Sequence, residues 1–96
     1  MVGYLIFTRE HTIDQAALDK YSGMVPATVS GHDLTMLVRY GAFEMLEGPP
    51  IEGAVVLRFP SVEQAKAYYN SESYQKAATH RHTGAAYRVF IVEGVN

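Results

Sequence analysis

The sequence predicts an α+β fold in which helices cover one face of a four-stranded antiparallel sheet. Short runs of β-branched and aromatic residues alternate with amphipathic helical stretches in the order β-α-β-β-α-β. Capping motifs precede the helical stretches. With 96 residues, the chain has room for one hydrophobic core, so we expect a single domain over residues 1–96.

The first strand and helix occupy the N-terminal third of the chain. Val2 to Thr8 is apolar on both faces, which is typical of a central strand. Thr12 and Gln15 fit a capping box at the start of a helix. Pro26 is expected to kink or end that helix because it lacks an amide hydrogen, and Gly31 is a natural stop. The predicted buried stripe is Ile13, Ala17, Tyr21 and Met24.

Residues 39–59 predict two strands joined by a long acidic loop with glycines and prolines, and we expect this stretch to form the middle of the sheet. The strands cover residues 34–40 and 53–59. In each, one face is apolar and the other mixed. The predicted helix-facing sets are Leu34, Met36, Val38 and Tyr40, and Val55, Leu57 and Phe59; the opposite sets are Thr35, Leu37 and Arg39, and Ala54, Val56 and Arg58.

The last third predicts two more helical segments and a strand. Ser61 is expected to cap the first segment together with Gln64, and Ser71 to cap a short second one. Tyr68 is expected to face outward. Residues 85–92 form the last predicted strand. The inward stripes are predicted to be Val62, Ala65 and Tyr69, and then Tyr74, Ala77, Ala78 and Arg81.

This order of elements is the ferredoxin-like split βαβ arrangement. Its helices lie on one side of the sheet, which leaves the other side open. The open side would expose several apolar side chains together, and large exposed apolar patches usually mark an interface. We therefore expect a homodimer through the open sheet face. The apolar residues predicted for that face are Leu37, Val56, Phe90, Val92, Leu5 and Phe7.

Several short motifs, in this order, resemble the family called domain of unknown function 1330. They are Arg39-x-Gly41-x-Phe43-Glu44-x-Leu46-Glu47-Gly48, Phe59-Pro60-Ser61, Tyr69-x-Ser71-x-x-Tyr74-Gln75, Arg81, and Val92-Glu93-Gly94. The resemblance covers nearly the whole chain. It implies a dimeric α/β barrel, in which two ferredoxin-like sheets pack face to face. The larger superfamily includes cofactor-free monooxygenases, haem-degrading enzymes, isomerases and cyclases, so the resemblance implies a scaffold but no particular reaction.

Composition narrows the classes of partner. A net charge of −2 provides no basic surface for nucleic acid or an anionic membrane. The chain has no cysteine, so it has no disulfide framework. No segment reaches the length of a membrane span. We expect a soluble, cytoplasmic protein.

Arg81 is the first candidate binding residue because it shares a helical stripe with Tyr74. A buried guanidinium needs a carboxylate partner or an anionic ligand. Glu47 is the preferred partner and Glu44 the second. The alternative interpretation is a structural ion pair, or a side chain that reaches solvent.

Arg39 and Tyr40 end a predicted strand beside the long loop, where they could bind a carboxylate or enolate oxygen. The alternative is that Arg39 pairs with a glutamate across the dimer. Tyr4, Tyr69 and Tyr74 could line a pocket and donate hydrogen bonds, although tyrosines at such spacing are more often core residues.

His80 and His82 flank Arg81, but side chains two residues apart on a helix diverge. We therefore expect no metal site and no cofactor. Both histidines remain weak candidates for a general base, because histidine titrates near neutrality.

These residues support two hypotheses. The first is a homodimeric protein that binds a small polar or anionic organic molecule, with cofactor-independent acid/base chemistry of the oxygenase, isomerase or cyclase type as an extension. The second is a non-catalytic dimerisation or ligand-sensing module whose charge pairs are structural. The sequence does not identify a substrate.

Overall fold

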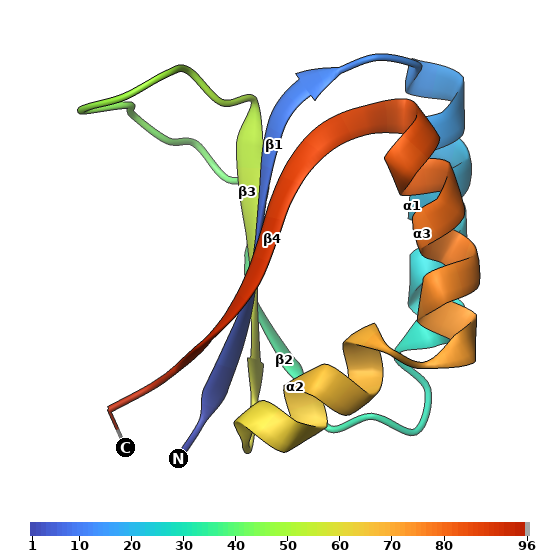
Figure 1. The fold of residues 1–96 in the computed structure, drawn as a ribbon, viewed down its shortest axis with the longest axis vertical. Helices are drawn as coiled ribbons and strands as arrows, with labels where there is room; N and C mark the ends of the chain where they lie inside the picture. Colours follow the sequence, from blue (N-terminus) through green and yellow to red (C-terminus); the bar gives the residue numbers. More distant parts are fainter. Residues whose placement is uncertain (96) are drawn as a thin grey trace.

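A computed structural model describes residues 1–95 and confirms the α+β fold. All three helices lie on one side of a four-stranded antiparallel sheet (Figure 1). The last helix has 13 residues and is longer than the short segment predicted. The elements are β1 (Gly3–Thr12), α1 (Gln15–Thr28), β2 (Thr35–Arg39), β3 (Gly53–Phe59), α2 (Val62–Tyr69), α3 (Glu72–Gly84) and β4 (Ala85–Glu93).

The strand order in the sheet is β2-β3-β1-β4. The predicted central position of β1 is confirmed. The expectation that residues 39–59 form the middle of the sheet is wrong for β2, which is an edge strand. β3 pairs with β1 on its other side, so it is central, whereas β2 pairs with β3 alone.

The two faces of β1 are the reverse of the prediction. Leu5 and Phe7 were expected on the open face, but they are only 1% and 3% exposed and belong to the core beneath the helices. Ile6 lies opposite Val56 on one side and Phe90 on the other, so it belongs to the open face. Because β1 is apolar on both faces, its alternation does not indicate which set meets the helices.

A β-bulge in β2 changes which side chains face the helices. Met36 pairs with the buried Leu57, but the register shifts before Val38, which pairs with Val56. Arg39 then pairs with Val55 and lies on the helix side. The predicted faces of Val38 and Arg39 are therefore wrong, because one inserted residue reverses the alternation that follows it.

α1 begins later than predicted and is not ended by Pro26. Asp14 is the N-cap and accepts hydrogen bonds from the amides of Ala16 and Ala17, whereas Thr12 ends β1 and bonds to Glu52. The helix continues past Pro26 to Thr28. Pro26 is exposed and lies near the end of the helix, where water can hydrate the carbonyl that the proline leaves unbonded.

The buried side of α1 also differs in part from the predicted stripe. Ile13 precedes the helix and is exposed. The buried apolar residue of α1 is Leu18. Gly31 has a φ of +80° in the turn after the helix, which agrees with its predicted role as a stop.

α2 and α3 follow the predicted caps. Ser61 accepts a hydrogen bond from the amide of Gln64, and Ser71 accepts one from the amide of Tyr74. Tyr68 was expected to face outward, but it is 1% exposed and its hydroxyl lies 2.8 Å from that of Thr28. The predicted inward residue Tyr69 is half-buried and packs against the same core. The predicted α3 stripe of Tyr74, Ala77, Ala78 and Arg81 is buried throughout.

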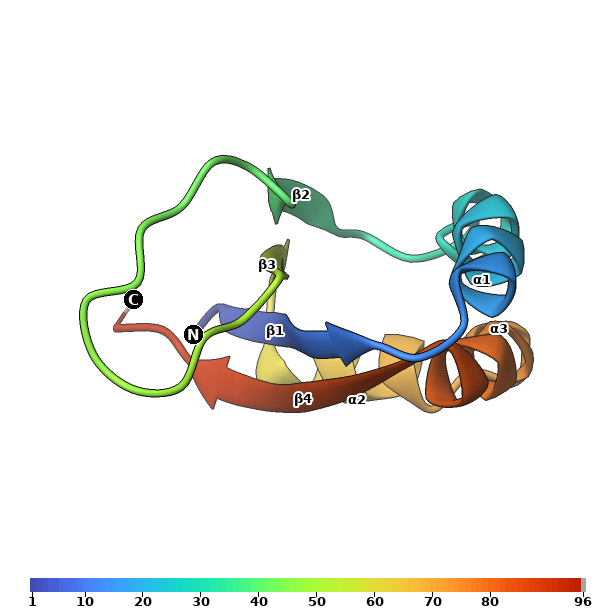
Figure 2. The same ribbon diagram turned by 90° about the horizontal axis from the view of Figure 1, so that it is seen from above.

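The helices meet the sheet unequally. α2 packs directly against β1, β3 and β4, whereas α1 packs mainly against α3. Seen from above, α1 and α3 form a pair set to one side of the strands (Figure 2). No helix within residues 1–95 is both long and apolar enough to cross a membrane.

Candidate functional site

A cavity of about 260 Å³ lies between α1 and the β2–β3 half of the sheet. α1 forms one wall, the two strands form the opposite wall, and aromatic side chains from β1, α2 and α3 complete the lining. The lining is mostly apolar, with an arginine and several tyrosines. It consists of Phe7, Tyr21, Ser22, Val25, Pro26, Val29, Met36, Arg39, Tyr40, Val55, Leu57, Tyr68 and Tyr74.

Arg39 and Tyr40 line this cavity at the end of β2, so the structure brings these two predicted residues together. The bulge in β2 turns Arg39 to this side of the sheet. Arg39 forms no ion pair within residues 1–95. Its guanidinium is therefore available to a ligand.

Tyr40 adopts a left-handed conformation with a φ of 51°, which is uncommon for a residue other than glycine. This turns its ring toward the helix side, although alternation after Arg39 would place it on the open face. The ring packs on Gly53, where an added Cβ would lie 2.7 Å from Cδ1 of Tyr40. Glycine at position 53 thus leaves the space that the ring occupies.

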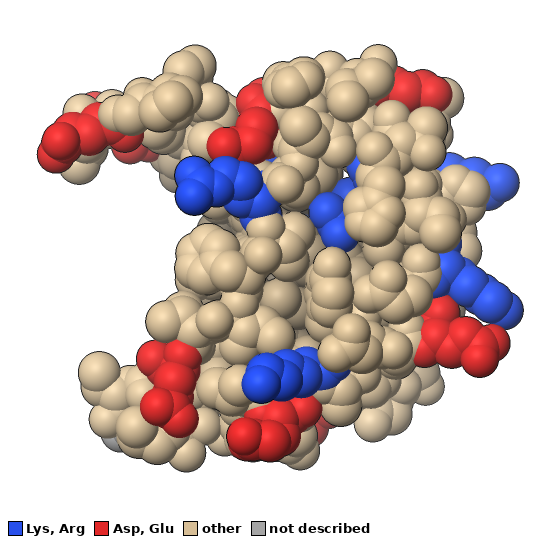
Figure 3. All heavy atoms as spheres, viewed as in Figure 1, with Lys and Arg blue, Asp and Glu red and all other residues tan. Residues whose placement is uncertain are grey.

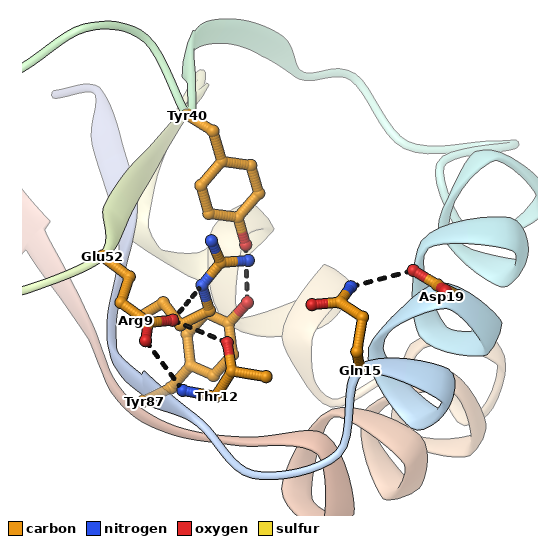
Figure 4. Close-up of polar contacts among 7 residues, drawn as sticks. All are labelled: Arg9, Thr12, Gln15, Asp19, Tyr40, Glu52 and Tyr87. Carbon is orange, nitrogen blue, oxygen red and sulfur yellow. Dashed lines mark hydrogen bonds and ion pairs between the residues drawn. The ribbon is translucent and has the colours of Figure 1, made fainter.

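A polar cluster supports Tyr40 from beneath (Figure 4). The hydroxyls of Tyr40 and Tyr87 are 2.6 Å apart, and the guanidinium of Arg9 lies 4.8 Å from the centre of the Tyr40 ring. Nε of Arg9 is 3.0 Å from Oε1 of Glu52, an ion pair whose angle falls short of a hydrogen bond. Glu52 also accepts hydrogen bonds from the hydroxyl and the amide of Thr12.

Sequence reasoning did not identify Arg9 and Tyr87 as site residues. The first strand was expected to end at Thr8, but it extends to Thr12. The spacing of Leu5, Phe7 and Arg9 continues the helix-facing alternation. This period of two was the signal that could have identified Arg9.

A second pair of tyrosine hydroxyls belongs to the opposite side of the cavity. Tyr21 of α1 and Tyr74 of α3 have hydroxyl oxygens 2.9 Å apart. Tyr74 is buried and Tyr21 half-buried. The predicted site residue Tyr74 therefore lies at the cavity, and α1 supplies a partner for it.

Arg81 lies next to the lining residues and is 4% exposed. Its guanidinium carbon is 5.2 Å from the ring centre of Tyr87 and 5.7 Å from that of Phe7. Nη2 lies 3.2 Å from Nε2 of His82, and Nε is buried with no hydrogen-bond partner in the described chain. Two aromatic faces and a histidine thus surround this cation, without a carboxylate.

The predicted ion pair of Arg81 with Glu47 or Glu44 is wrong. Both glutamates lie in the exposed loop between β2 and β3, which projects away from the sheet on the side opposite the helices (Figure 1). The loop has no helical or strand structure that would direct it back over the sheet. Its sequence therefore gave no reliable indication of where its charges lie.

The tyrosines at the cavity remain protonated at neutral pH. Burial is the main reason that the pKa values of Tyr21, Tyr40 and Tyr74 are raised. The nearby Arg81 opposes this change at Tyr21 and Tyr74. These hydroxyls can therefore donate hydrogen bonds but are poor bases near neutral pH.

In the upper half of Figure 3, a small basic patch lies between the sheet and the α1–α3 pair, and a larger one lies over the sheet toward its open side, next to acidic side chains. Arg9 and Arg39 both lie on the helix side of the sheet, and Arg81 is buried nearby. Arg9 is paired with Glu52, so Arg39 and Arg81 supply the positive charge beside the cavity, although the whole chain carries a net charge of −2.

The remaining candidates lie outside the cavity lining. Tyr4 is on the open face of the sheet, between Arg58 and Val92. His80 is half-buried and His82 exposed on α3. Burial and the Arg81 charge lower the pKa of His82. Within residues 1–95, no three acidic or histidine side chains are close enough together to hold a metal ion.

The model of the family named domain of unknown function 1330 matches residues 2–95. The chain belongs to this family. A comparison of the chain with curated proteins found no match.

Solved structures share the fold of this family member. A protein of unknown function from Rhodopseudomonas palustris superposes with a TM-score of 0.72 at 17% identity, over 99% of this chain and 83% of that one. A dimeric protein of unknown function with a ferredoxin-like fold, from Bacteroides fragilis, superposes with a TM-score of 0.64 at 10% identity. The match covers 97% of this chain and 96% of that one. An ethyl tert-butyl ether D family protein from Bacillus halodurans superposes with a TM-score of 0.65 at 15% identity. The match covers 99% of this chain and 100% of that one. These similarities establish a ferredoxin-like fold.

Proposed function

We propose that this protein binds a small anionic organic molecule in the cavity between α1 and the β2–β3 half of the sheet. The observation that carries the proposal is Arg39, which lines a largely apolar cavity without a carboxylate partner in the described chain. A planar guanidinium suits a carboxylate, which it can bind through two hydrogen bonds.

The cavity restricts the size and the character of the ligand. Its volume of about 260 Å³ is slightly below the roughly 300–1,000 Å³ that is usual for ligand pockets. Valine, methionine and leucine side chains cover much of its wall and favour an apolar body. Arg81 adds a second positive charge nearby and disfavours cations.

The lining favours binding over acid/base catalysis. A general base works best with a pKa near the operating pH. Tyr21, Tyr40 and Tyr74 have raised pKa values, which makes them poor bases near neutral pH. His80 and His82 lie outside the lining.

Isothermal titration calorimetry with benzoate and benzamide tests the proposal, because the two probes share a ring and differ in charge. We expect benzoate to bind at least tenfold more tightly, since hydrogen bonds to a charged group contribute about 1.5–3 kcal/mol. Arg39→Gln should remove this preference. The matched control Arg58→Gln alters an exposed arginine on the open face and should preserve it. Equal binding of the two probes to the unmodified protein would contradict the proposal.

We also propose that the protein is a homodimer through its open sheet face. Leu37, Val38, Phe90 and Val92 are 40–50% exposed, which is unusual for apolar side chains this close together. The register places Val38 and Phe90 on the same face as Ile6. The Bacteroides fragilis protein, which shares the fold, is described as dimeric. This observation favours the dimerisation module as a second candidate function.

Native mass spectrometry tests the assembly. Phe90→Asp should convert a dimer to a monomer, because it places a charge in the apolar face. Ile13→Asp changes an apolar residue just before α1 that is 64% exposed, compared with 50% for Phe90, and should leave the dimer intact. A monomeric unmodified protein would refute this part of the proposal.

A further inference from the structure

We infer that the ligand carries a hydrogen-bond-accepting oxygen at the end opposite its carboxylate, as in a small hydroxy-substituted aromatic acid. This inference rests on the proposed function and specifies the ligand class. Its basis is a second polar position in the cavity, the hydroxyl pair of Tyr21 and Tyr74.

The two polar positions belong to opposite walls. Arg39 and Tyr40 end β2, whereas Tyr21 lies on α1 and Tyr74 on α3. Apolar side chains such as Val25, on α1, and Leu57, on β3, belong to the same two walls. A molecule that uses both positions therefore needs one polar group at each end of an apolar body.

A count of hydroxyl hydrogens shows that the Tyr21–Tyr74 pair requires an acceptor. The two hydroxyls carry two hydrogens, and the bond between them uses one. Burial keeps both hydroxyls protonated, because it raises the pKa of Tyr21 and of Tyr74. Arg81, the charged neighbour of the pair, can only donate. One hydrogen is therefore left for an acceptor in the cavity.

Tyr68 provides the contrast, because it also lines the cavity. The hydroxyl of Thr28 donates to the carbonyl of Val25 at 2.6 Å, so its contact with Tyr68 uses the hydrogen of Tyr68. Tyr68 has no hydrogen left to donate. The Tyr40–Tyr87 pair keeps one hydrogen by the same count, but Tyr40 ends β2 beside Arg39, so that hydrogen belongs to the carboxylate end of the cavity.

The charge of Arg81 sets the polarity of the second group. It acts favourably on negative charge at both hydroxyls, as its lowering influence on the pKa values of Tyr21 and Tyr74 shows. An electron-rich oxygen is favoured at this position, and a cationic group is not. A phenolic hydroxyl or a carbonyl oxygen meets this requirement.

Calorimetric titration with 4-hydroxybenzoate and 4-methylbenzoate tests the inference, because the two probes are similar in size and differ in the acceptor. We expect 4-hydroxybenzoate to bind roughly 3- to 10-fold more tightly, the effect of one neutral hydrogen bond. Tyr21→Phe should reduce the preference, and the double variant with Tyr74→Phe should abolish it. The control Tyr4→Phe removes a hydroxyl on the open face and should leave the preference unchanged.

The possible outcomes separate the two claims. If 4-methylbenzoate binds as tightly as 4-hydroxybenzoate while benzoate is still preferred to benzamide, the inference is overturned and the proposed function stands. A preference for 4-hydroxybenzoate that survives in the double variant also overturns the inference. If benzoate and benzamide bind equally, the proposed function itself has failed.

Discussion

The two ends of the helix layer contain similar residues but pack differently. α2 lies directly on the sheet, and Tyr68 fills the space between them with its hydroxyl bonded to Thr28. α1 packs mainly against α3 instead, and a cavity remains between α1 and strands β2 and β3. Tyr21 and Tyr74 beside that cavity keep one hydroxyl hydrogen free. Tyr68 and Tyr74 both belong to the buried core and line the cavity, but Tyr68 uses its hydroxyl hydrogen on Thr28, whereas the Tyr21–Tyr74 pair keeps one.

This contrast indicates that the position of a helix, and not the residue type, decides whether a tyrosine hydroxyl uses its hydrogen within the protein or keeps it for the cavity. Side chains close the gap where a helix rests on the sheet, so their polar groups must find partners within the protein. A helix that is held by another helix leaves room for a ligand. Substitutions in the two regions should therefore affect different properties.

The largest effect is expected for Tyr68→Ala. Loss of a buried aromatic side chain should lower the free energy of unfolding by about 3–5 kcal/mol, as measured by urea denaturation. Met36→Ala removes an exposed residue from the cavity wall and should cost less than about 1 kcal/mol while weakening ligand binding. Similar stability losses for the two variants would mean that the regions do not differ as described.

The contact between α1 and α3 should be nearly as sensitive. A Cβ added at Gly84 would lie 2.8 Å from Cδ2 of Leu18 and 2.9 Å from its backbone nitrogen, so Gly84→Ala must push the helices apart. We expect a loss of about 1–3 kcal/mol in urea denaturation. Gly23→Ala is the control, because nothing lies within 4 Å of the added Cβ. It should stabilise α1 by about 0.5–1 kcal/mol.

A change at Gly53 should affect the cavity more than the core. Gly53→Ala places a methyl group where the ring of Tyr40 packs, so Tyr40 must move away from Tyr87. We expect affinity for benzoate to fall several-fold in calorimetry, with a stability loss of about 1 kcal/mol. Unchanged affinity would show that the position of Tyr40 is not part of the site.

The smallest predicted effect is the pH dependence at His82. Burial and Arg81 lower its pKa in the folded protein, whereas the unfolded chain titrates near the usual value of about 6.5. The unfolded state therefore takes up a proton first as the pH falls. Stability is complete above about pH 6.5 and declines toward the folded pKa.

Urea denaturation of the unmodified protein and of His82→Gln at pH 7.5 and 5.5 measures how much the protonation of His82 contributes to the pH dependence of stability. The variant should lose less stability on acidification, by under about 1 kcal/mol because His82 is largely exposed. An equal loss of stability in both proteins would show that His82 does not contribute to the pH dependence of stability.

The fold was predictable because its signals are local. The caps at Ser61 and Ser71 and the α3 stripe from Tyr74 to Arg81 follow from residue spacing alone, and the structure has each of them. The face of Arg39 was not predictable, since a bulge leaves no distinct mark in the residues 34–40 that contain it. The partner of Arg81 was not predictable either, because the path of the loop that carries Glu47 depends on contacts beyond its own sequence.

The most direct test of the cavity as a ligand site is a methyl NMR titration of the protein with benzoate. The account predicts that methyl signals of Val25, Val29 and Met36, which line the cavity, shift with a common binding curve. Signals of Val38 and Val92 on the open face should stay in place. Shifts confined to the open-face methyls, or no shifts at millimolar benzoate, would contradict the account.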